Sequence, residues 1–310
     1  MIKNKIFTYL RVMRVSQWIK NLVVFTAIIF SGRLFDADLF IKTTQAFFIF
    51  CLLSSTAYVL NDIIDYPYDK KHRIKRFRPI ASGEITMPEA TFIVFIFTLL
   101  SLILALFFSL PMFFLSLLFI LLHFFYSMYI KKHPAVDIFA ISFSFMIRTF
   151  AGEVATGFHI PIWLILTIFF ISLFMASVKR HAELVTHGST ARESLFFYKE
   201  HFLDFLTQTF ATSTIIAYST YTYSTYDFSR PIHVENSFSK LFAGLLPGFE
   251  GRKWMMLSIP LVVYGISRYA QLLYEKAEGE RPEKLITTDV PLITTIILWG
   301  ILVIGLIYIF

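Results

Sequence analysis

Apolar residues run in blocks along most of the chain, separated by short polar and basic segments. Each block approaches or exceeds the roughly 17–25 residues with which a helix crosses a bilayer. The nine blocks are residues 20–35, 39–60, 91–109, 112–130, 135–156, 161–178, 205–226, 254–274 and 291–310. This pattern predicts an all-α integral membrane protein with about nine transmembrane helices. Residues 1–310 are expected to form a single polytopic membrane domain.

The composition supports a membrane protein. Hydrophobic residues make up 56% of the 310 residues, and the mean hydropathy is +0.67, whereas soluble domains are about 45–50% apolar. The 37 Phe and 15 Tyr residues suit lipid-facing helices and interfacial belts. The single cysteine, Cys51, lies inside the second block, so no disulfide framework is expected.

The net charge of +7 is distributed unevenly between the two predicted sides of the membrane. The N-terminal side carries 21 Lys and Arg residues and the opposite side carries 6, with Arg148 left inside a span. This bias predicts a multi-pass protein of the cell inner (plasma) membrane, with its N-terminus and active site in the cytoplasm. Because the basic residues are scattered among loops that face lipid headgroups, nucleic-acid binding is not expected.

The clearest chemical signal follows the second block, in the stretch NDIIDYPYD. Asn61, Asp62, Asp65 and Asp69 are spaced so that, on a helix, their oxygens share one face at the membrane surface. Oxygen ligands without His or Cys suit Mg²⁺, which is completed by waters and substrate phosphates. Carboxylates this close together repel one another unless a cation lies between them. We therefore predict a magnesium site, in which Asp62 and Asp65 act catalytically through the metal.

Basic residues follow the acidic motif directly. Lys75, Arg76 and Arg78 precede a turn marked by Pro79 and Gly83. An arginine can hold a phosphate through two parallel hydrogen bonds. A metal site flanked by such cations has the residue types that bind a diphosphate. These three residues are therefore predicted to bind the phosphates of a donor substrate.

Further candidates lie in three other segments expected to face the cytoplasm and within one span. They are Arg14 and the donor-phosphate candidate Lys20 before the first span, Tyr126, Lys131 and Asp137 at a helix–loop–helix junction, and Lys179, Arg180 and Glu183 after the sixth span. Arg148 lies eleven residues after Asp137, nearly on the same helical face. A guanidinium at that depth is costly unless it faces a polar cavity, so Arg148 is also predicted to bind substrate.

NDIIDYPYD, followed by RPIASG, resembles the UbiA superfamily of intramembrane prenyltransferases. The resemblance implies a UbiA-like fold of nine helices around a central polar cavity open to the cytoplasmic face. It also implies a first Asp-rich motif after the second helix and Mg²⁺ bound to a substrate diphosphate. The helix count, the motif position and the sidedness of the loops extend the resemblance over the whole chain.

The sequence departs from most of that superfamily after the sixth span, where ASVKRHAE replaces a second Asp-rich motif. Lys179 and Arg180 would hold a phosphate directly, with Glu183 orienting Lys179. With QWIKN and SRYAQLLYEKAEGERPEKLITTD, this segment resembles the branch of decaprenyl-phosphate phosphoribosyltransferases. That branch implies transfer of 5-phosphoribose from phosphoribosyl pyrophosphate to a polyprenyl phosphate, with release of pyrophosphate, towards arabinofuranose donor lipids. An anionic acceptor needs no dedicated general base.

Two other functions are compatible with parts of the pattern. A UbiA-type prenyltransferase would move a polyprenyl chain from its diphosphate to an aromatic or lipid acceptor, but the cations after the sixth span argue against it. A membrane transporter would also carry charges within its spans. Transporters often show repeated halves with broken helices, and the sequence has no such symmetry. Homo-oligomerisation is compatible with the sequence.

Overall fold

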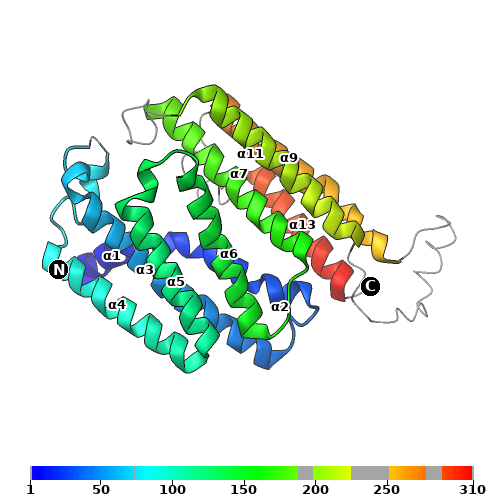
Figure 1. Ribbon diagram of the computed structural model, residues 1–310, viewed down its shortest axis with the longest axis horizontal. Coiled ribbons are helices and arrows are strands. Elements are labelled where there is room, and N and C mark those ends of the chain that lie inside the picture. Colours follow the sequence, from blue (N-terminus) through cyan, green and yellow to red (C-terminus); the bar gives the residue numbers. More distant parts are fainter. Residues whose placement is uncertain (1, 73, 188–197, 225–250, 277–287, 309–310) are drawn as a thin grey trace. The chain divides into compact units, whose positions relative to one another are not determined.

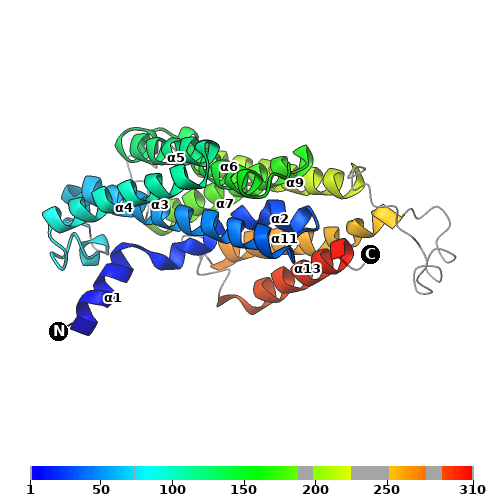
Figure 2. The same ribbon diagram turned by 90° about the horizontal axis from the view of Figure 1, so that it is seen from below.

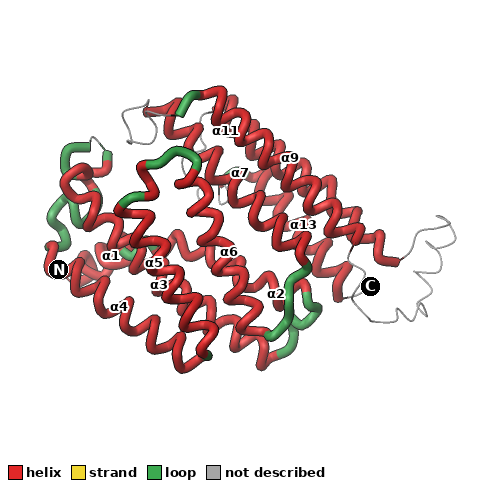
Figure 3. Tube along the Cα trace, viewed as in Figure 1, coloured by secondary structure: helices red, strands yellow, loops and turns green. Residues whose placement is uncertain are grey.

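The computed structural model describes residues 2–72, 74–187, 198–224, 251–276 and 288–308. These residues form helices and connecting segments, with no strand among them (Figure 3). The predicted all-α class is therefore confirmed. Three parts of the sequence predictions lie outside the described residues. They are Arg73 of the basic loop, the ends of two predicted spans at 225–226 and 309–310, and residues 277–287 of the last motif.

Contacts divide the chain into two compact units. Unit 1 comprises Met1–His159 with Arg192–Tyr198, and unit 2 comprises Ile160–Ala191 with Lys199–Phe310. The single membrane domain expected for residues 1–310 stays a prediction.

Unit 1 is built around one long helix, α3, which contacts η1, α4, α5 and α6. Figure 1 shows these helices side by side, and Figure 2 shows α1 at the edge of the unit, leading into η1. The elements are α1 (Ile2–Val12), the 3-10 helix η1 (Val15–Phe25), α2 (Thr26–Phe30), α3 (Ala37–Asp69), the 3-10 turn η2 (Lys75–Phe77), α4 (Met87–Phe108), α5 (Leu110–Met128), the 3-10 turn η3 (Ile130–Lys132) and α6 (Val136–Thr156).

The described residues of unit 2 form four long helices and a short one. They are α7 (Ile162–His187), α9 (Glu200–Ser224), the 3-10 helix η5 (Gly251–Ser258), α11 (Ile259–Lys276) and α13 (Val290–Tyr308). The helix pairs α7–α9 and α11–α13 are in contact (Figure 1). A buried hydrogen-bond network joins α9, η5 and α13, because Tyr218 Oη lies 2.7 Å from Ser258 Oγ and accepts from Trp299 Nε1 at 2.9 Å.

Local sequence signals explain where several helices begin and end. Asp36 caps α3 by accepting from the backbone N–H of its first turn, and Ser109 caps α5 in the same way. Thr86 and Glu89 form a reciprocal capping box at the start of α4. Gly157 ends α6 with φ of 73°, a left-handed conformation that glycine adopts without strain.

Seven helices in the described part of the chain are long and apolar enough to cross a membrane. They are Ala37–Asp69, Met87–Phe108, Leu110–Met128, Val136–Thr156, Ile162–Val185, Trp254–Tyr274 and Val290–Tyr308. The two other predicted spans correspond to the shorter apolar segment Val15–Phe30 and to α9, whose sequence is rich in Thr, Ser and Tyr. The predicted count of nine is therefore not confirmed, whereas the multi-pass membrane class is.

The outward side chains of α4 show what surrounds this protein. Phe92 is 64% exposed, Phe95 62% and Phe107 87%. A surface of large apolar side chains is unfavourable in water and natural against lipid tails. The helix therefore presents a lipid-facing surface.

Close helix packing in unit 1 depends on Gly152 of α6. A Cβ atom at this position would overlap the backbone carbonyl of Val24 in η1. Gly152→Ala should therefore force backbone movement and destabilise the protein by about 1–3 kcal/mol. The matched control is Gly300→Ala in α13, where the added Cβ would have no neighbour within 4 Å among the described residues outside its own helix backbone.

Thermal unfolding of both variants in detergent checks this prediction. Gly300→Ala should leave the melting temperature unchanged or slightly raised, since alanine favours a helix over glycine. Equal melting temperatures for the Gly152→Ala variant and the unsubstituted protein would contradict the close approach of α6 and η1.

Candidate functional site

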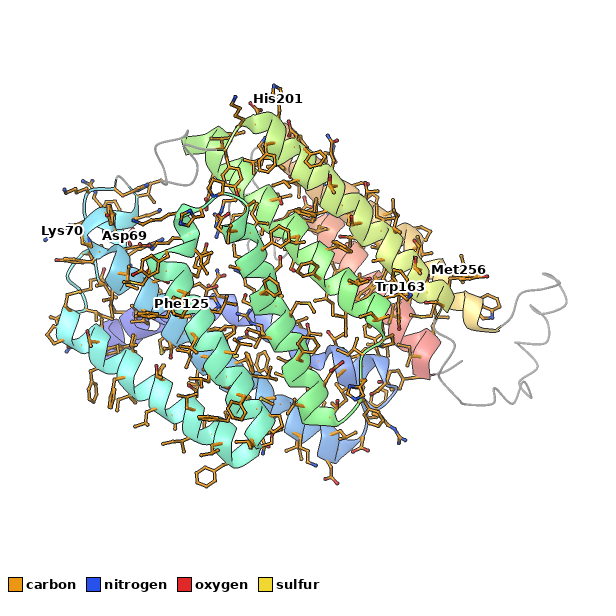
Figure 4. The ribbon with its side chains drawn as sticks, in the orientation of Figure 1. Asp69, Lys70, Phe125, Trp163, His201 and Met256 are labelled. Atoms are coloured by element: carbon orange, nitrogen blue, oxygen red, sulfur yellow. The ribbon has the colours of Figure 1, made fainter. Side chains whose placement is uncertain are left out.

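The acidic motif lies on the last turns of α3, which continues as a helix beyond its apolar block. Asp69 is the final residue of the helix, and Asp69 and Lys70 are labelled at this end in Figure 4. Asp62 and Asp69 are each 3% exposed, while Asn61 and Asp65 are half-buried. Carboxylates on successive turns of one helix repel one another, so their charge has to be offset by neighbouring groups.

Two arginines neutralise the buried pair of carboxylates. Arg78 Nη1 donates to Asp62 Oδ1 at 3.0 Å and to Asp69 Oδ2 at 2.6 Å. Arg14 Nη2 donates to the same Asp62 oxygen at 2.5 Å. Burial acts to lower the pKa of Arg14, but the Asp62 carboxylate and its neighbours raise the pKa overall, so the guanidinium stays charged. Arg14, from the segment before η1, and Arg78, from the turn after η2, therefore meet at Asp62 of α3.

A lysine performs the same task for the other half of the motif. Lys131 Nζ forms an ion pair with Asp65 and lies 3.5 Å from Asn61 Oδ1. Asn61 Nδ2 donates to Asp65 Oδ2 at 2.9 Å, and Ser127 Oγ donates to Asn61 Oδ1 at 3.3 Å. Because Lys131 belongs to η3 and Ser127 to the end of α5, the α5–α6 connection completes the cluster.

The turn after η2 places Arg78 beside the motif. Gly83 has φ of 82°, which allows the chain to reverse after Arg78. Ile80 and Ile85 in this turn are buried with Val59 of α3 in one apolar cluster. This apolar packing fixes the turn against the helix and explains why Arg78, and not its neighbours, reaches the carboxylates.

The other predicted donor-phosphate residues are Arg76, Lys75 and Lys20. Arg76 is exposed, with its guanidinium 4.9 Å from the Phe77 ring centroid. Lys75 belongs to η2. Lys20 lies in η1, where its charge acts on His123 of α5. The structure thus shows Arg78 in contact with the acidic motif, and donor binding by Lys20, Lys75 and Arg76 stays a prediction.

Asp137 is engaged in a structural contact that the sequence did not indicate. It is fully buried and accepts from Tyr198 Oη at 2.8 Å. The same hydroxyl accepts from the backbone N–H of Ala135 at 2.5 Å, where φ is 65°. Asp137 and Tyr198 together therefore hold the turn that precedes α6. Tyr126, also predicted to bind substrate, has its ring centroid 6.4 Å from that of His123.

Lys179 and Arg180 are adjacent on α7 in unit 2, and Glu183 follows one turn later. Arg180 is 1% exposed, and its Nη1 donates to Glu183 Oε2 at 2.6 Å. The structure shows Glu183 in contact with Arg180, and the orientation of Lys179 by Glu183 stays a prediction. A buried arginine held by a carboxylate in this way has a fixed orientation.

Arg148 is 4% exposed within α6. Its Nε donates to Asn21 Oδ1 at 2.6 Å, its Nη1 to the backbone oxygen of Ser144 at 2.8 Å, and its Nη2 to Ser54 Oγ at 3.3 Å. Asn21 and Ser54 were not among the predicted site residues, because an isolated amide or hydroxyl in an apolar block carries no distinctive signal.

The acidic motif has the donor set of a Mg²⁺–diphosphate site. Among the described residues, no group of three His, Cys, Asp or Glu side chains could hold a metal ion by itself. Mg²⁺ usually takes one or two carboxylates and completes its shell with water and substrate phosphates. Asp62, Asp65 and Asp69 offer carboxylate oxygens from one helix face. Arg78 and Lys131 contact these carboxylates and are therefore close enough to bind a phosphate group that arrives with the metal. The residues fit a metal that arrives with its diphosphate.

An all-helical membrane protein with carboxylates, arginines and lysines at one helix end fits the class of intramembrane transferases. Comparison with known proteins agrees. The model of the UbiA prenyltransferase family matches residues 22–182, and the chain belongs to this family.

Relatives and solved structures extend the match beyond those residues. The chain is 34% identical to a decaprenyl-phosphate phosphoribosyltransferase of Mycolicibacterium smegmatis, covering 70% of each chain. It is 28% identical to the Corynebacterium glutamicum protein of the same name, over 99% of this chain and 89% of that one. A UbiA homolog from Archaeoglobus fulgidus bound to GPP and Mg²⁺ superposes with a TM-score of 0.66 at 18% identity, covering 97% of this chain and 99% of the other.

The bridge made by Arg78 can be tested through stability. Arg78→Met would leave the buried carboxylates of Asp62 and Asp69 without this partner, and we expect a loss of about 1–3 kcal/mol. Arg76→Met is the matched control, because Arg76 is exposed and its guanidinium lies over the Phe77 ring. Thermal unfolding in detergent, without phosphate ligands, measures both. Equal effects of the two substitutions would contradict the assigned role of Arg78.

Proposed function

We propose that the protein transfers 5-phosphoribose from phosphoribosyl pyrophosphate to a polyprenyl phosphate of decaprenyl type and releases pyrophosphate. The observation that carries the proposal is the cluster in which Asp62, Asp65 and Asp69 meet Arg14, Arg78 and Lys131 at one end of α3. The names of the bacterial relatives supply the donor and acceptor classes. The same relationship suggests that the product leads towards arabinofuranose donor lipids.

Mg²⁺ would be held by the carboxylates of Asp62, Asp65 and Asp69 with the amide oxygen of Asn61. The Mg²⁺ in a related solved structure supports this assignment. When bound, the metal supplies positive charge that stabilises the departing pyrophosphate. Arg78, Arg14 and Lys131 can exchange carboxylate contacts for phosphate oxygens, since charge-assisted hydrogen bonds form equally well to either anion.

The reaction itself needs little acid–base chemistry. The bond between C1 of the ribose and the pyrophosphate oxygen breaks, and both electrons leave with pyrophosphate. An oxygen of the lipid phosphate, already anionic, forms the new bond to C1. No proton has to move, which is consistent with a site of carboxylates and cations without a dedicated general base.

The cations of α7 favour this reaction over prenyl transfer. Lys179 and Arg180 stand where we expect a second Asp-rich motif in most relatives, and neither can bind Mg²⁺. They can hold a phosphate monoester, which the proposed reaction supplies on both substrates. The excess of Lys and Arg on the N-terminal side of the sequence supports an active site on the cytoplasmic face of the inner membrane.

The direct test incubates purified protein with Mg²⁺, radiolabelled phosphoribosyl pyrophosphate and a polyprenyl phosphate. We expect a labelled lipid and stoichiometric pyrophosphate. A parallel reaction offers a polyprenyl diphosphate and 4-hydroxybenzoate. Prenylation of the aromatic acid without any phosphoribosyl transfer would overturn the proposed reaction and favour the prenyltransferase function.

The metal assignment predicts the behaviour of the acidic motif. Asp62→Asn, Asp65→Asn and Asp69→Asn should each remove most turnover, because each loses a negative oxygen ligand while the helix is preserved. Asp38→Asn is the control, since Asp38 is an exposed carboxylate at the other end of α3. Initial rates over a Mg²⁺ titration measure the effect. Near-normal rates in all three variants, or activity that survives EDTA, would contradict the assignment.

The role of α7 gives a further prediction. A charge-assisted contact to phosphate contributes about 1.5–3 kcal/mol, so Lys179→Ala should lower kcat/KM by roughly tenfold or more. Lys199→Ala is the matched control, because Lys199 is an exposed lysine just before α9. If steady-state kinetics gave the same kcat/KM for both variants, Lys179 would have no role in substrate binding.

A further inference from the structure

Unit 1 contains a polar seam that runs from the acidic motif into the interior, along one face of α3. Ser54, Tyr58 and Asp62 are spaced at i, i+4 and i+8, so they lie above one another on that face. At 1.5 Å per residue, the seam extends about 12 Å along the helix axis. Such a row is unexpected inside an apolar, membrane-spanning helix.

The segment from Arg14 through η1 contacts these three positions of α3 in turn. At the motif, Arg14 pairs with Asp62. One turn deeper, Tyr58 Oη donates to Gln17 Oε1 at 3.3 Å.

At the deepest level, Asn21 contacts Ser54 of α3. Its Oδ1 accepts from Ser54 Oγ at 3.1 Å. Tyr58 and Gln17 at the middle level are only half-buried. The seam is therefore partly accessible between its two ends.

The deep end of the seam carries a positive charge without a counter-ion. Every hydrogen-bond partner of Arg148 in the described part of the chain is a neutral oxygen, from Asn21, Ser54 or Ser144. The guanidinium lies 4.6 Å from the Phe119 ring centroid and 5.3 Å from that of Phe145. An arginine has five N–H donors, and these contacts use four of them.

A second unsatisfied donor group lies beside this arginine. His123 Nε2 is buried and has no hydrogen-bond partner among the described residues. Its ring centroid is 4.4 Å from that of Phe119, the ring over which Arg148 lies. Uncompensated positive charge within a membrane span is costly and marks a functional group.

We infer that Arg148, with His123, binds a phosphate monoester, namely the 5-phosphate of the donor sugar. This inference rests on the proposed function. The donor is a ribose with a diphosphate on C1 and a phosphate on C5, so it presents two anionic groups separated by a sugar. The seam presents cations at two levels, Arg14 beside Asp62 and Arg148 at the deep end. The hydroxyl of Tyr58 and the amide of Gln17 lie between them. Neutral groups of this kind suit the ribose hydroxyls.

The test compares two ligands that differ in the 5-phosphate. Calorimetry in the presence of Mg²⁺ measures the affinity of phosphoribosyl pyrophosphate and of inorganic pyrophosphate. Arg148→Met should weaken phosphoribosyl pyrophosphate binding by about tenfold or more while leaving pyrophosphate binding unchanged. Arg78→Met is the comparison, because it should weaken both ligands. An unchanged affinity ratio in Arg148→Met would overturn the inference.

A second variant keeps the arginine and gives its charge a counter-ion. Asn21→Asp is nearly isosteric and would give Arg148 a carboxylate in place of the amide oxygen that it already contacts. The fold should be retained or stabilised, as thermal unfolding would show. Because the carboxylate occupies the arginine, the preference for phosphoribosyl pyrophosphate over pyrophosphate should fall by about tenfold or more. If Arg148 were only structural, Asn21→Asp would leave this preference intact.

Two further outcomes separate the alternatives. The lipid acceptor also carries a phosphate monoester, so the KM for the polyprenyl phosphate is measured in Asn21→Asp. A raised acceptor KM with unchanged donor affinity would assign the Arg148 site to the lipid and overturn the donor assignment. Failure of the unsubstituted protein to bind phosphoribosyl pyrophosphate would refute the proposed function itself, which distinguishes that failure from a failure of the subsite.

Discussion

The site of this protein depends on the pairing of three carboxylates at the end of a membrane helix with cations from other segments. Asp62 and Asp69 are almost completely buried, and like charges at this spacing are stable only when they are neutralised. Arg14, Arg78 and Lys131 provide that neutralisation from η1, the turn after η2, and η3. The constraint therefore links four chain segments that are distant in sequence.

The same constraint explains how such a site could accept a metal with its diphosphate. Cations and carboxylates that neutralise each other can rearrange when a divalent metal and a phosphate group arrive together, because the balance of charge is preserved. A metal without an anion would have to displace Arg78 from two carboxylates. The metal and the diphosphate should therefore bind cooperatively. Cooperative binding suits a transferase whose metal is needed only when the substrate is bound.

Several features of the fold and site could be predicted from the sequence. The apolar blocks gave the helical membrane class, and the spacing of Asn61, Asp62, Asp65 and Asp69 placed these residues on one helix. The sequence could not decide which of Lys75, Arg76 and Arg78 reaches the carboxylates, because that depends on how Ile80 and Ile85 bury the turn. The sequence predicted that Asp137 binds substrate, but it did not indicate the hydrogen bond that Asp137 accepts from Tyr198. Tyr198 is 61 residues away in the sequence, and no local pattern indicates such a contact.

The central claim is that the carboxylates of α3 bind a divalent metal only together with a diphosphate. Electron paramagnetic resonance of Mn²⁺, titrated into the purified protein with and without pyrophosphate, tests it most directly. We predict weak Mn²⁺ binding alone and tight, stoichiometric binding when pyrophosphate is present, with the tight binding lost in Asp62→Asn. Tight binding of Mn²⁺ without pyrophosphate, or no difference between the two titrations, would contradict the account.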